Sequence, residues 1–181
     1  MPLIGDHAPE FHAMTTQGKI DFPADYKGSW VVLFSHPADF TPVCTTEFIA
    51  LSRMNETFES LNTKLIGLSI DSLHSHLGWI KSIEALNFNN EGKVKIPFPI
   101  IADISMNVAK KYGMLQTVAN TQTVRAVFII DPEGIIRTIL YYPMSTGRNI
   151  PEIIRILQSL QLNDKTHYST PANWQPGDDV V

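Results

Sequence analysis

The strand-to-helix junction that decides the fold reads His36-Pro37-Ala38-Asp39-Phe40-Thr41-Pro42-Val43-Cys44-Thr45-Thr46-Glu47. An apolar run over residues 30–34 precedes it and is typical of a buried strand. Apolar residues spaced three and four apart follow it and predict an amphipathic helix: Phe48, Leu51, Met54, Phe58 and Leu61. Thr41 suits the N-cap and Pro42 the first helical position, because an N-cap oxygen accepts from an orphan N–H and proline has none. Cys44 is therefore expected in the first helical turn.

Cys44 is the only cysteine among the 181 residues. The positive end of the helix dipole favours its thiolate, but by only ~0.3–1 kcal/mol, or up to ~2 kcal/mol when partly buried. A strongly activated thiolate therefore needs a second cation nearby. The alternative is a cysteine that packs as a small apolar side chain. The cap, the proline and the polar residues after Cys44 make a poor core environment, which favours the reactive thiol.

The composition indicates one globular domain, because 44% apolar and 18% charged residues suffice for a proper core. A net charge of −4 without a basic cluster makes nucleic acid and anionic membranes poor candidates for partners. The apolar runs are too short to span a bilayer, and no secretory leader opens the chain. A lone cysteine cannot form an internal disulfide, and we expect a reducing, cytoplasmic location.

The N-terminal half predicts a β-hairpin followed by a β-α-β unit. The hairpin strands are expected over residues 11–14 and 20–22. The central strands are expected over residues 30–35 and 64–70, joined by a helix that ends near residue 62. Such a crossover makes the two strands parallel. Cys44 then lies at the carboxyl end of the strands, where ligands of open α/β sheets bind.

The C-terminal half predicts that the sheet is mixed. Ser72 is expected to cap a helix with the apolar stripe Leu73, Leu77, Ile80 and Ile83. Pro97 and Pro99 limit residues 96–102 to an edge strand or a loop. Residues 105–112 are expected to form a short helix. The turn over residues 131–134 joins two further strands, over residues 123–130 and 135–142, as an antiparallel hairpin.

The chain is expected to end in a helix and an extended tail. The helix is expected over residues 150–162, with a buried stripe of Ile153, Ile154, Ile156, Leu157 and Leu160. Residues 163–181 are rich in Pro, Gly, Asp and Thr, which is typical of a segment with little regular structure. We therefore predict a domain over residues 1–162 and a tail over residues 163–181.

Several separated motifs resemble those of one protein family. Pro37 and the run from Thr41 to Glu47 resemble the active-site signature of the peroxiredoxins, which are thiol peroxidases. The one-cysteine branch is indicated by further motifs at residues 69–72, 98–101, 142–143 and 146–149. The resemblance runs from about Gly5 to Gly177. It implies a thioredoxin-like α/β fold with a central mixed sheet flanked by helices and an N-terminal hairpin.

The chemistry of a thiol peroxidase explains the candidate catalytic residues Cys44, Thr41, Arg125 and Pro37. Attack on a peroxide requires donors that stabilise charge on the departing oxygen in a water-poor pocket. The Thr41 hydroxyl is expected to donate to the peroxide while it accepts from the first helical turn. Arg125 begins an apolar strand and matches the arginine of the family, although a structural salt bridge is the alternative. Pro37 is expected to shield the sulfur, and it also suits a strand end.

Three further residues are expected to support this site. Glu47 and Arg148 match positions of the family that orient Arg125, and the alternative is a surface ion pair. His36 either contacts the thiol or caps the strand end. The other histidines do not build a site, because His74 and His76 lie two apart on a helix and face different ways. No metal ion and no cofactor are expected.

The leading hypothesis is a thiol-dependent peroxidase that reduces hydrogen peroxide and organic hydroperoxides. Cys44 would become a sulfenic acid and, without a second cysteine, would be resolved by an external thiol such as glutathione or thioredoxin. The second hypothesis is a holdase-type chaperone or binding protein on the same fold. The resemblance also implies a homodimer or a higher homo-oligomer.

A lipid hydrolase is a third hypothesis, because some relatives of the branch are credited with phospholipase activity. Ser29 is the corresponding serine, but it lacks the second glycine of a nucleophile elbow. Pro23 also stands where those relatives carry a histidine. Both departures argue against a hydrolase.

Overall fold

The computed structural model describes residues 1–116 and 121–181. The chain forms two compact units, Met1–Arg148 and Asn149–Val181. The first unit holds the sheet and its helices, and the second consists of the last helix and the segment that follows it. Within the described residues, no helix is both long and apolar enough to cross a membrane. The domain limits at residues 162 and 163 stay a prediction.

The described part of the first unit is built on a seven-stranded sheet with the order β2-β1-β5-β4-β3-β6-β7. Its strands are β1 (Phe11–Thr15), β2 (Gly18–Phe22), β3 (Trp30–Ser35), β4 (Thr63–Ser69), β5 (Ile100–Ala102), β6 (Arg125–Ile130) and β7 (Ile136–Tyr142). β3, β4 and β5 are parallel, whereas the other neighbouring strands are antiparallel. The predicted N-terminal hairpin, β-α-β unit and mixed sheet are confirmed.

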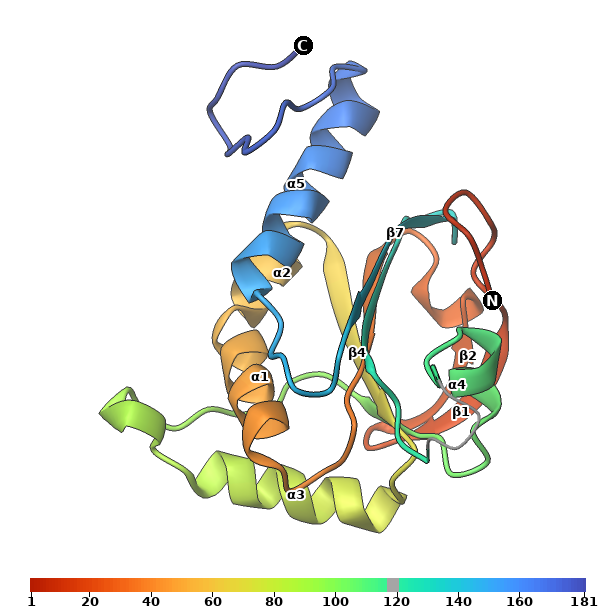
Figure 1. The fold of residues 1–181 in the computed structure, drawn as a ribbon, viewed down its shortest axis with the longest axis vertical. Helices are drawn as coiled ribbons and strands as arrows, with labels where there is room; N and C mark the ends of the chain where they lie inside the picture. The colour runs from red at the N-terminus through yellow and green to blue at the C-terminus, as the bar shows by residue number, and fades with distance from the viewer. Residues whose placement is uncertain (117–120) are drawn as a thin grey trace. The chain divides into compact units, whose positions relative to one another are not determined.

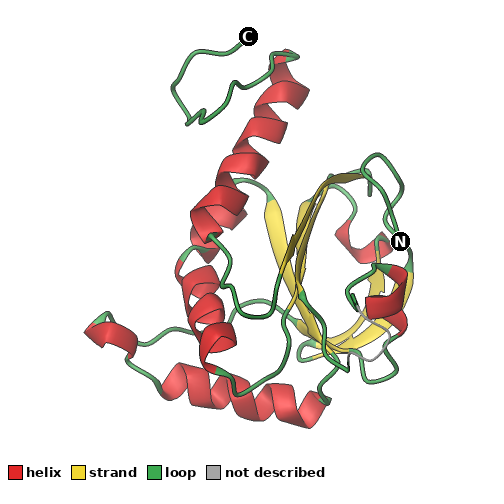
Figure 2. Ribbon diagram, in the orientation of Figure 1, coloured by secondary structure: helices red, strands yellow, loops and turns green. Residues whose placement is uncertain are grey.

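Helices cover both faces of this sheet. Figure 1 shows α1 and α3 on one side of the sheet and α4 on the other, and Figure 2 shows the strands as a layer between them. The helices of this unit are α1 (Pro42–Arg53), α2 (Asn55–Ser60), α3 (Leu73–Ala85) and α4 (Asn107–Lys111), with 3-10 turns η1 (Ala24–Tyr26) and η2 (Phe88–Asn90). All six residues of β3 are buried as a result.

The two faces of β3 pack into different halves of the core, because successive side chains of a strand point to opposite sides. On one face, the ring centroid of Phe34 lies 5.5 Å from that of Phe48, which lies 4.6 Å from that of Trp79. On the other face, Val31 and Leu33 belong to the apolar cluster that also holds residues of α4. The strand that leads to Cys44 is thus fixed from both sides.

Two elements differ from the prediction. The helix that begins at Pro42 is interrupted at Met54, where the backbone leaves helical geometry (φ −97°, ψ 4°), and continues as the separate α2. β5 lies inside the sheet between β1 and β4 rather than at an edge. Pro97 and Pro99 precede β5, so the strand keeps its backbone N–H groups for pairing.

The buried face of α3 is rotated relative to the predicted stripe. Ser72 caps the helix as predicted, since its hydroxyl accepts from the backbone N–H of Ser75 at 3.1 Å. However, the buried residues are His76, Trp79 and Ile83, whereas Leu77 is 39% exposed. The large Trp79 ring occupies the core and turns Leu77 outward. A histidine therefore faces the interior of the molecule.

The second unit contains α5 (Ile150–Thr166), which ends four residues beyond the predicted limit of 162. Asn149 caps its first turn by accepting from the backbone N–H of Glu152 at 3.1 Å. Its buried residues are Ile150, Ile153, Ile154 and Leu157, so the predicted stripe is right for three positions. The segment after α5 closes on itself, because the backbones of Ser169 and Val181 exchange two hydrogen bonds.

Candidate active site

Cys44 lies in the first turn of α1, just beyond the carboxyl end of β3, and its side chain is 0% exposed. Thr41 is the N-cap and Pro42 the first helical residue, as predicted. The helical hydrogen bonds begin with the N–H of Thr45, which donates to the Thr41 carbonyl at 3.0 Å. The N–H groups of Val43 and Cys44 therefore lie ahead of the helical ladder and direct positive partial charge to this end of α1.

The Thr41 hydroxyl does not cap the helix, which corrects the prediction that it accepts from the first turn. It donates instead to the carbonyl of Ala38 at 2.8 Å. Because its one proton is used there, the oxygen presents lone pairs rather than a donor to a neighbouring molecule. The backbone turn over residues 38–41 thus fixes the direction in which the hydroxyl proton points.

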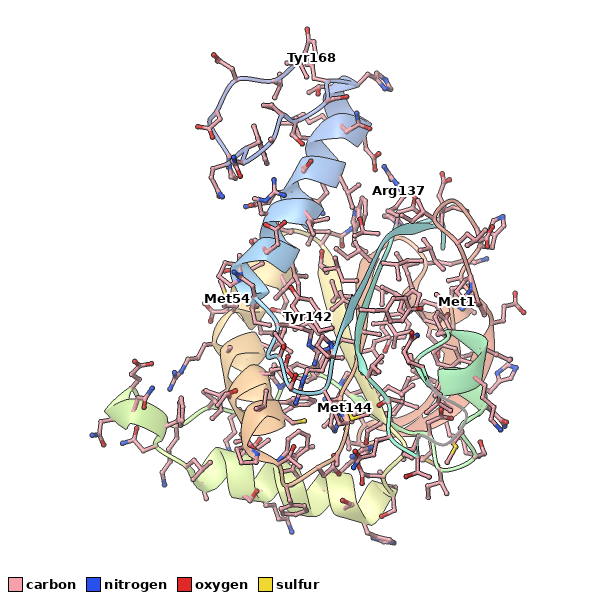
Figure 3. The ribbon with its side chains drawn as sticks, in the orientation of Figure 1. Met1, Met54, Arg137, Tyr142, Met144 and Tyr168 are labelled. Atoms are coloured by element: carbon pink, nitrogen blue, oxygen red, sulfur yellow. The ribbon has the colours of Figure 1, made fainter. Side chains whose placement is uncertain are left out.

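Arg125 is the cation that the sequence predicted beside Cys44. Its Nη1 donates to the Cys44 sulfur at 3.2 Å and to Glu47 Oε1 at 2.5 Å. Its Nε donates to the carbonyl of Met144 at 2.9 Å, on the loop after β7 where Figure 3 labels Met144. Arg125 is only 3% exposed, so these contacts form away from bulk solvent.

The sheet topology brings Arg125 to Cys44 across 81 positions of sequence. β6 is the antiparallel neighbour of β3, with Val127 opposite Phe34. Since the strands run in opposite directions, the first residue of β6 lies beside the end of β3, from which the chain enters α1.

Glu47 and Arg148 hold the guanidinium of Arg125 in place. Arg148 donates to Glu47 Oε2 from Nε at 2.6 Å and from its backbone N–H at 2.9 Å. Its Nη1 donates to the carbonyls of Ser35 and Ala126 at 2.7 and 2.9 Å. Glu47 is 3% and Arg148 7% exposed, so the alternative of a surface ion pair does not apply.

Glu47 is the anion of this network. Burial opposes its ionisation, but the charge and hydrogen bonds of Arg148 and the charge of Arg125 outweigh burial and hold the Glu47 pKa below its usual value of 4.5. Two guanidinium groups and one carboxylate leave one positive charge uncompensated. The Cys44 sulfur, 3.2 Å from Arg125 Nη1, lies next to this positive charge.

Pro37 is buried in the segment between β3 and α1. His36, the last residue before it, is 0% exposed, and its Nε2 donates to Asp39 Oδ1 at 2.7 Å. Its Nδ1 has no hydrogen-bond partner among the described residues. Burial lowers the His36 pKa more than the neighbouring Asp39 raises it, so the ring is neutral.

Sequence reasoning missed Asp39 and His76. His36 and His76 meet at the Asp39 carboxylate, with His76 Nδ1 2.7 Å from Oδ2, so the expectation that the other histidines stand apart was wrong for His76. His74 is exposed and faces away from His76, as predicted. The sequence does contain a signal for His76. It lies three residues before Trp79, and this spacing places both side chains on one face of a helix.

The residues considered for a hydrolase lie elsewhere. Ser29 and Pro23 line a cavity of about 30 Å³. No histidine is among its lining residues in the described chain, so the serine has no imidazole base there.

The chain is similar to known proteins over most of its length. A family model described as the AhpC/TSA family matches residues 4–139, and one described as the C-terminal domain of 1-Cys peroxiredoxin matches residues 159–181. A peroxiredoxin of Methanosarcina mazei is 63% identical over 183 residues, covering 100% of this chain and 84% of its own. One of Aquifex aeolicus is 53% identical over 177 residues, covering 97% and 78%.

Solved structures share the whole fold. A yeast mitochondrial 1-Cys peroxiredoxin, described for its thiol resolving mechanism via glutathione/thioredoxin systems, matches with a TM-score of 0.91 and 46% identity over 100% of this chain and 86% of its own. A mutant of peroxiredoxin 6 of Arenicola marina matches with a TM-score of 0.91 and 40% identity over 100% and 83%. The chain therefore belongs to the AhpC/TSA family and, within it, to the one-cysteine peroxiredoxins, which are thiol-dependent peroxidases.

Proposed function

We propose that the chain reduces hydrogen peroxide and organic hydroperoxides through Cys44 as the peroxidatic cysteine. The observation that carries this proposal is the 3.2 Å contact between Arg125 Nη1 and the Cys44 sulfur. The thiolate donates an electron pair to the terminal oxygen of the hydroperoxide, so an S–O bond forms while the O–O bond breaks. With one proton from solvent, the products are a sulfenic acid and water or an alcohol.

Three neighbouring residues each contribute differently to this step. Arg125 stabilises the thiolate and the negative charge that develops on the departing oxygen, because a fixed cation in a dry site needs no reorganisation. Thr41 accepts the O–H of the hydroperoxide, since its own proton is held by Ala38. Pro37 excludes water from the sulfur.

The return to the thiol uses an external thiol. The 181 residues hold one cysteine, so they offer no second thiol to attack the sulfenic acid. A thiol of the glutathione or thioredoxin type attacks that sulfur, which releases water and forms a mixed disulfide, and a second thiol then reduces the disulfide. The glutathione/thioredoxin systems named for the yeast protein support this class of reductant.

The test is rapid mixing of the reduced protein with one equivalent of hydrogen peroxide, followed by intact mass. We expect fast addition of one oxygen at Cys44, none in Cys44→Ser, and oxidation slowed about 100-fold or more in Arg125→Ala, as for removal of a preorganised donor. Arg53→Ala is the matched control, because Arg53 is an exposed residue at the far end of α1. Oxidation no faster than that of a free thiol would overturn the proposal.

A further inference from the structure

A buried cluster beneath the active-site loop is not used by the mechanism above. Asp39 Oδ1 accepts from His36 Nε2 at 2.7 Å, and Asp39 Oδ2 accepts from the Ser75 hydroxyl at 2.8 Å. His76 Nδ1 lies 2.7 Å from the same Oδ2, and His76 Nε2 lies 3.0 Å from the carbonyl of Ile101. His36, His76 and Asp39 are 0%, 0% and 7% exposed. The cluster joins the loop before α1 to α3 and β5.

The acceptors around His76 fix the number of its protons. A backbone carbonyl only accepts, so His76 Nε2 carries a hydrogen toward Ile101. Burial opposes ionisation of Asp39, but hydrogen bonds from both histidines hold its pKa far below the usual value, so Asp39 is a carboxylate. A carboxylate also only accepts, and Nδ1 of His76 must carry a hydrogen as well. His76 is therefore an imidazolium paired with Asp39, while His36 is neutral.

Asp39 in turn holds a strained stretch of backbone. Phe40 has φ 59°, a left-handed conformation that is unfavourable for a bulky residue. Its side chain is 60% exposed, so packing of the ring does not compensate for that strain. Asp39, the residue before Phe40, is held through its backbone as well as its side chain, because its N–H donates to Asp71 Oδ2 at 3.0 Å. The anchored turn ends at Thr41, from which α1 and Cys44 start.

We propose that His76 is a positioning residue of the peroxidase, which as an imidazolium clamps Asp39 and thereby sets the place of Thr41 and of the first turn of α1. This inference rests on the proposed function, because the reaction that it tunes is the oxidation of Cys44. It assigns a role in the site to a residue of α3, which follows Cys44 by 32 positions.

The complete link from Asp39 through His76 to Ile101 needs both ring protons of His76. The titratable groups that face His76 are Asp39 from the loop and His36 from the end of β3, while Arg148 acts on His36 and Asp71 lies beyond the Asp39 N–H. If His76 carries only one proton, only one of its two contacts remains a hydrogen bond: either Nδ1 faces Asp39 Oδ2 at 2.7 Å or Nε2 faces the Ile101 carbonyl at 3.0 Å as one acceptor against another. Two acceptors repel at such a distance, so the link from Asp39 through His76 to Ile101 is broken at one of its two ends.

Two variants separate the hydrogen bonds of His76. The side-chain nitrogen of Asn occupies the position of Nδ1 and keeps a donor toward Asp39, whereas that of Gln reaches the position of Nε2 and keeps the donor toward Ile101. His76→Gln should slow the oxidation of Cys44 by about tenfold or more, because small displacements of reacting groups are costly. His76→Asn should stay within about threefold of the unaltered protein. Thermal unfolding and circular dichroism establish that each variant is folded.

A nitrogen NMR spectrum tests directly whether both ring nitrogens of His76 carry a proton. In the complete chain labelled with ¹⁵N-histidine, both ring nitrogens of His76 should appear protonated at pH 7, and a single protonated nitrogen would overturn the inference. Equal rates in His76→Gln and His76→Asn, whether slow or normal, would also overturn it, because a merely structural role affects both alike. If either variant does not fold, the nitrogen spectrum decides. Slow oxidation of the unaltered protein would refute the proposed function instead, and the spectrum would still test the clamp.

Discussion

At the residue scale, the site is a balance of buried charges. Arg125 and Arg148 share the carboxylate of Glu47, and the sulfur of Cys44 completes the set. Charges removed from water are stable only with close partners of opposite sign. Substitution of the central carboxylate therefore leaves two buried guanidinium groups without their anion.

Glu47→Gln should lower the free energy of unfolding by roughly 3–5 kcal/mol at neutral pH, because two buried guanidinium groups lose their anion. The Glu47 pKa is depressed in the folded state, so its stabilising effect is fully present above the unfolded value of 4.5 and is lost as the pH falls through the folded pKa. Urea unfolding at several pH values should show the two proteins converging on acidification. Glu56→Gln on exposed α2 is the control. A difference in unfolding free energy that does not change with pH would contradict this expectation.

Thr41→Val should slow the oxidation of Cys44 by about 10- to 100-fold, because the isosteric side chain removes a polar group that orients the peroxide. Thr41→Ser keeps the hydroxyl and should retain most of the rate. Since the hydroxyl accepts no helical N–H, Thr41→Val should not show the full stability loss of a removed cap. Stopped-flow fluorescence and thermal unfolding measure the two effects, and equal rates in both variants would contradict the assigned role.

At the scale of elements, the two helix starts near the site use different caps. α3 has a side-chain cap from Ser72, whereas α1 begins at a threonine whose hydroxyl is turned to Ala38. The N-terminal N–H groups of α1 thus remain directed to the region of the sulfur. A capped α1 would use one of these groups internally, and its start would be a weaker anion site.

Ser72→Ala should lower the free energy of unfolding by about 1 kcal/mol, the usual effect of a lost N-cap. The rate of Cys44 oxidation should not change, because α3 remains packed through Trp79 and Ile83. Guanidinium unfolding and rapid mixing provide the two readouts, with Ser60→Ala on the surface as the control. A large loss of rate without a loss of stability would show that Ser72 acts on the site.

At the scale of the whole molecule, the single cysteine determines the fate of the oxidised protein. Without a thiol, excess hydrogen peroxide should add a second oxygen to Cys44, giving an inactive sulfinic acid. With glutathione present, intact mass should show a mixed disulfide before the second oxygen is added. Cys44→Ser is the control for oxidation elsewhere. Persistence of the sulfenic acid in the presence of both glutathione and thioredoxin would contradict resolution by an external thiol of this class.

The sequence by itself determined the β-α-β unit, the hairpins and the position of Cys44 in a first helical turn. These features depend on local patterns, namely apolar periodicity, Pro42 at the helix start and the turn at residues 131–134. The sequence also singled out Arg125, because a charge in an apolar strand requires an anionic partner. Its assignment to the site came from the resemblance to the peroxiredoxins.

Only the tertiary structure decided which distant residues meet. The interior place of β5, the buried face of α3 and the direction of the Thr41 hydroxyl follow from packing and from hydrogen bonds to neighbouring backbone. The meeting of His36 with His76 at Asp39 depends on where α3 lies against the loop before α1. Local patterns contain no information about such contacts, because the order of strands in a sheet places residues far apart in sequence side by side.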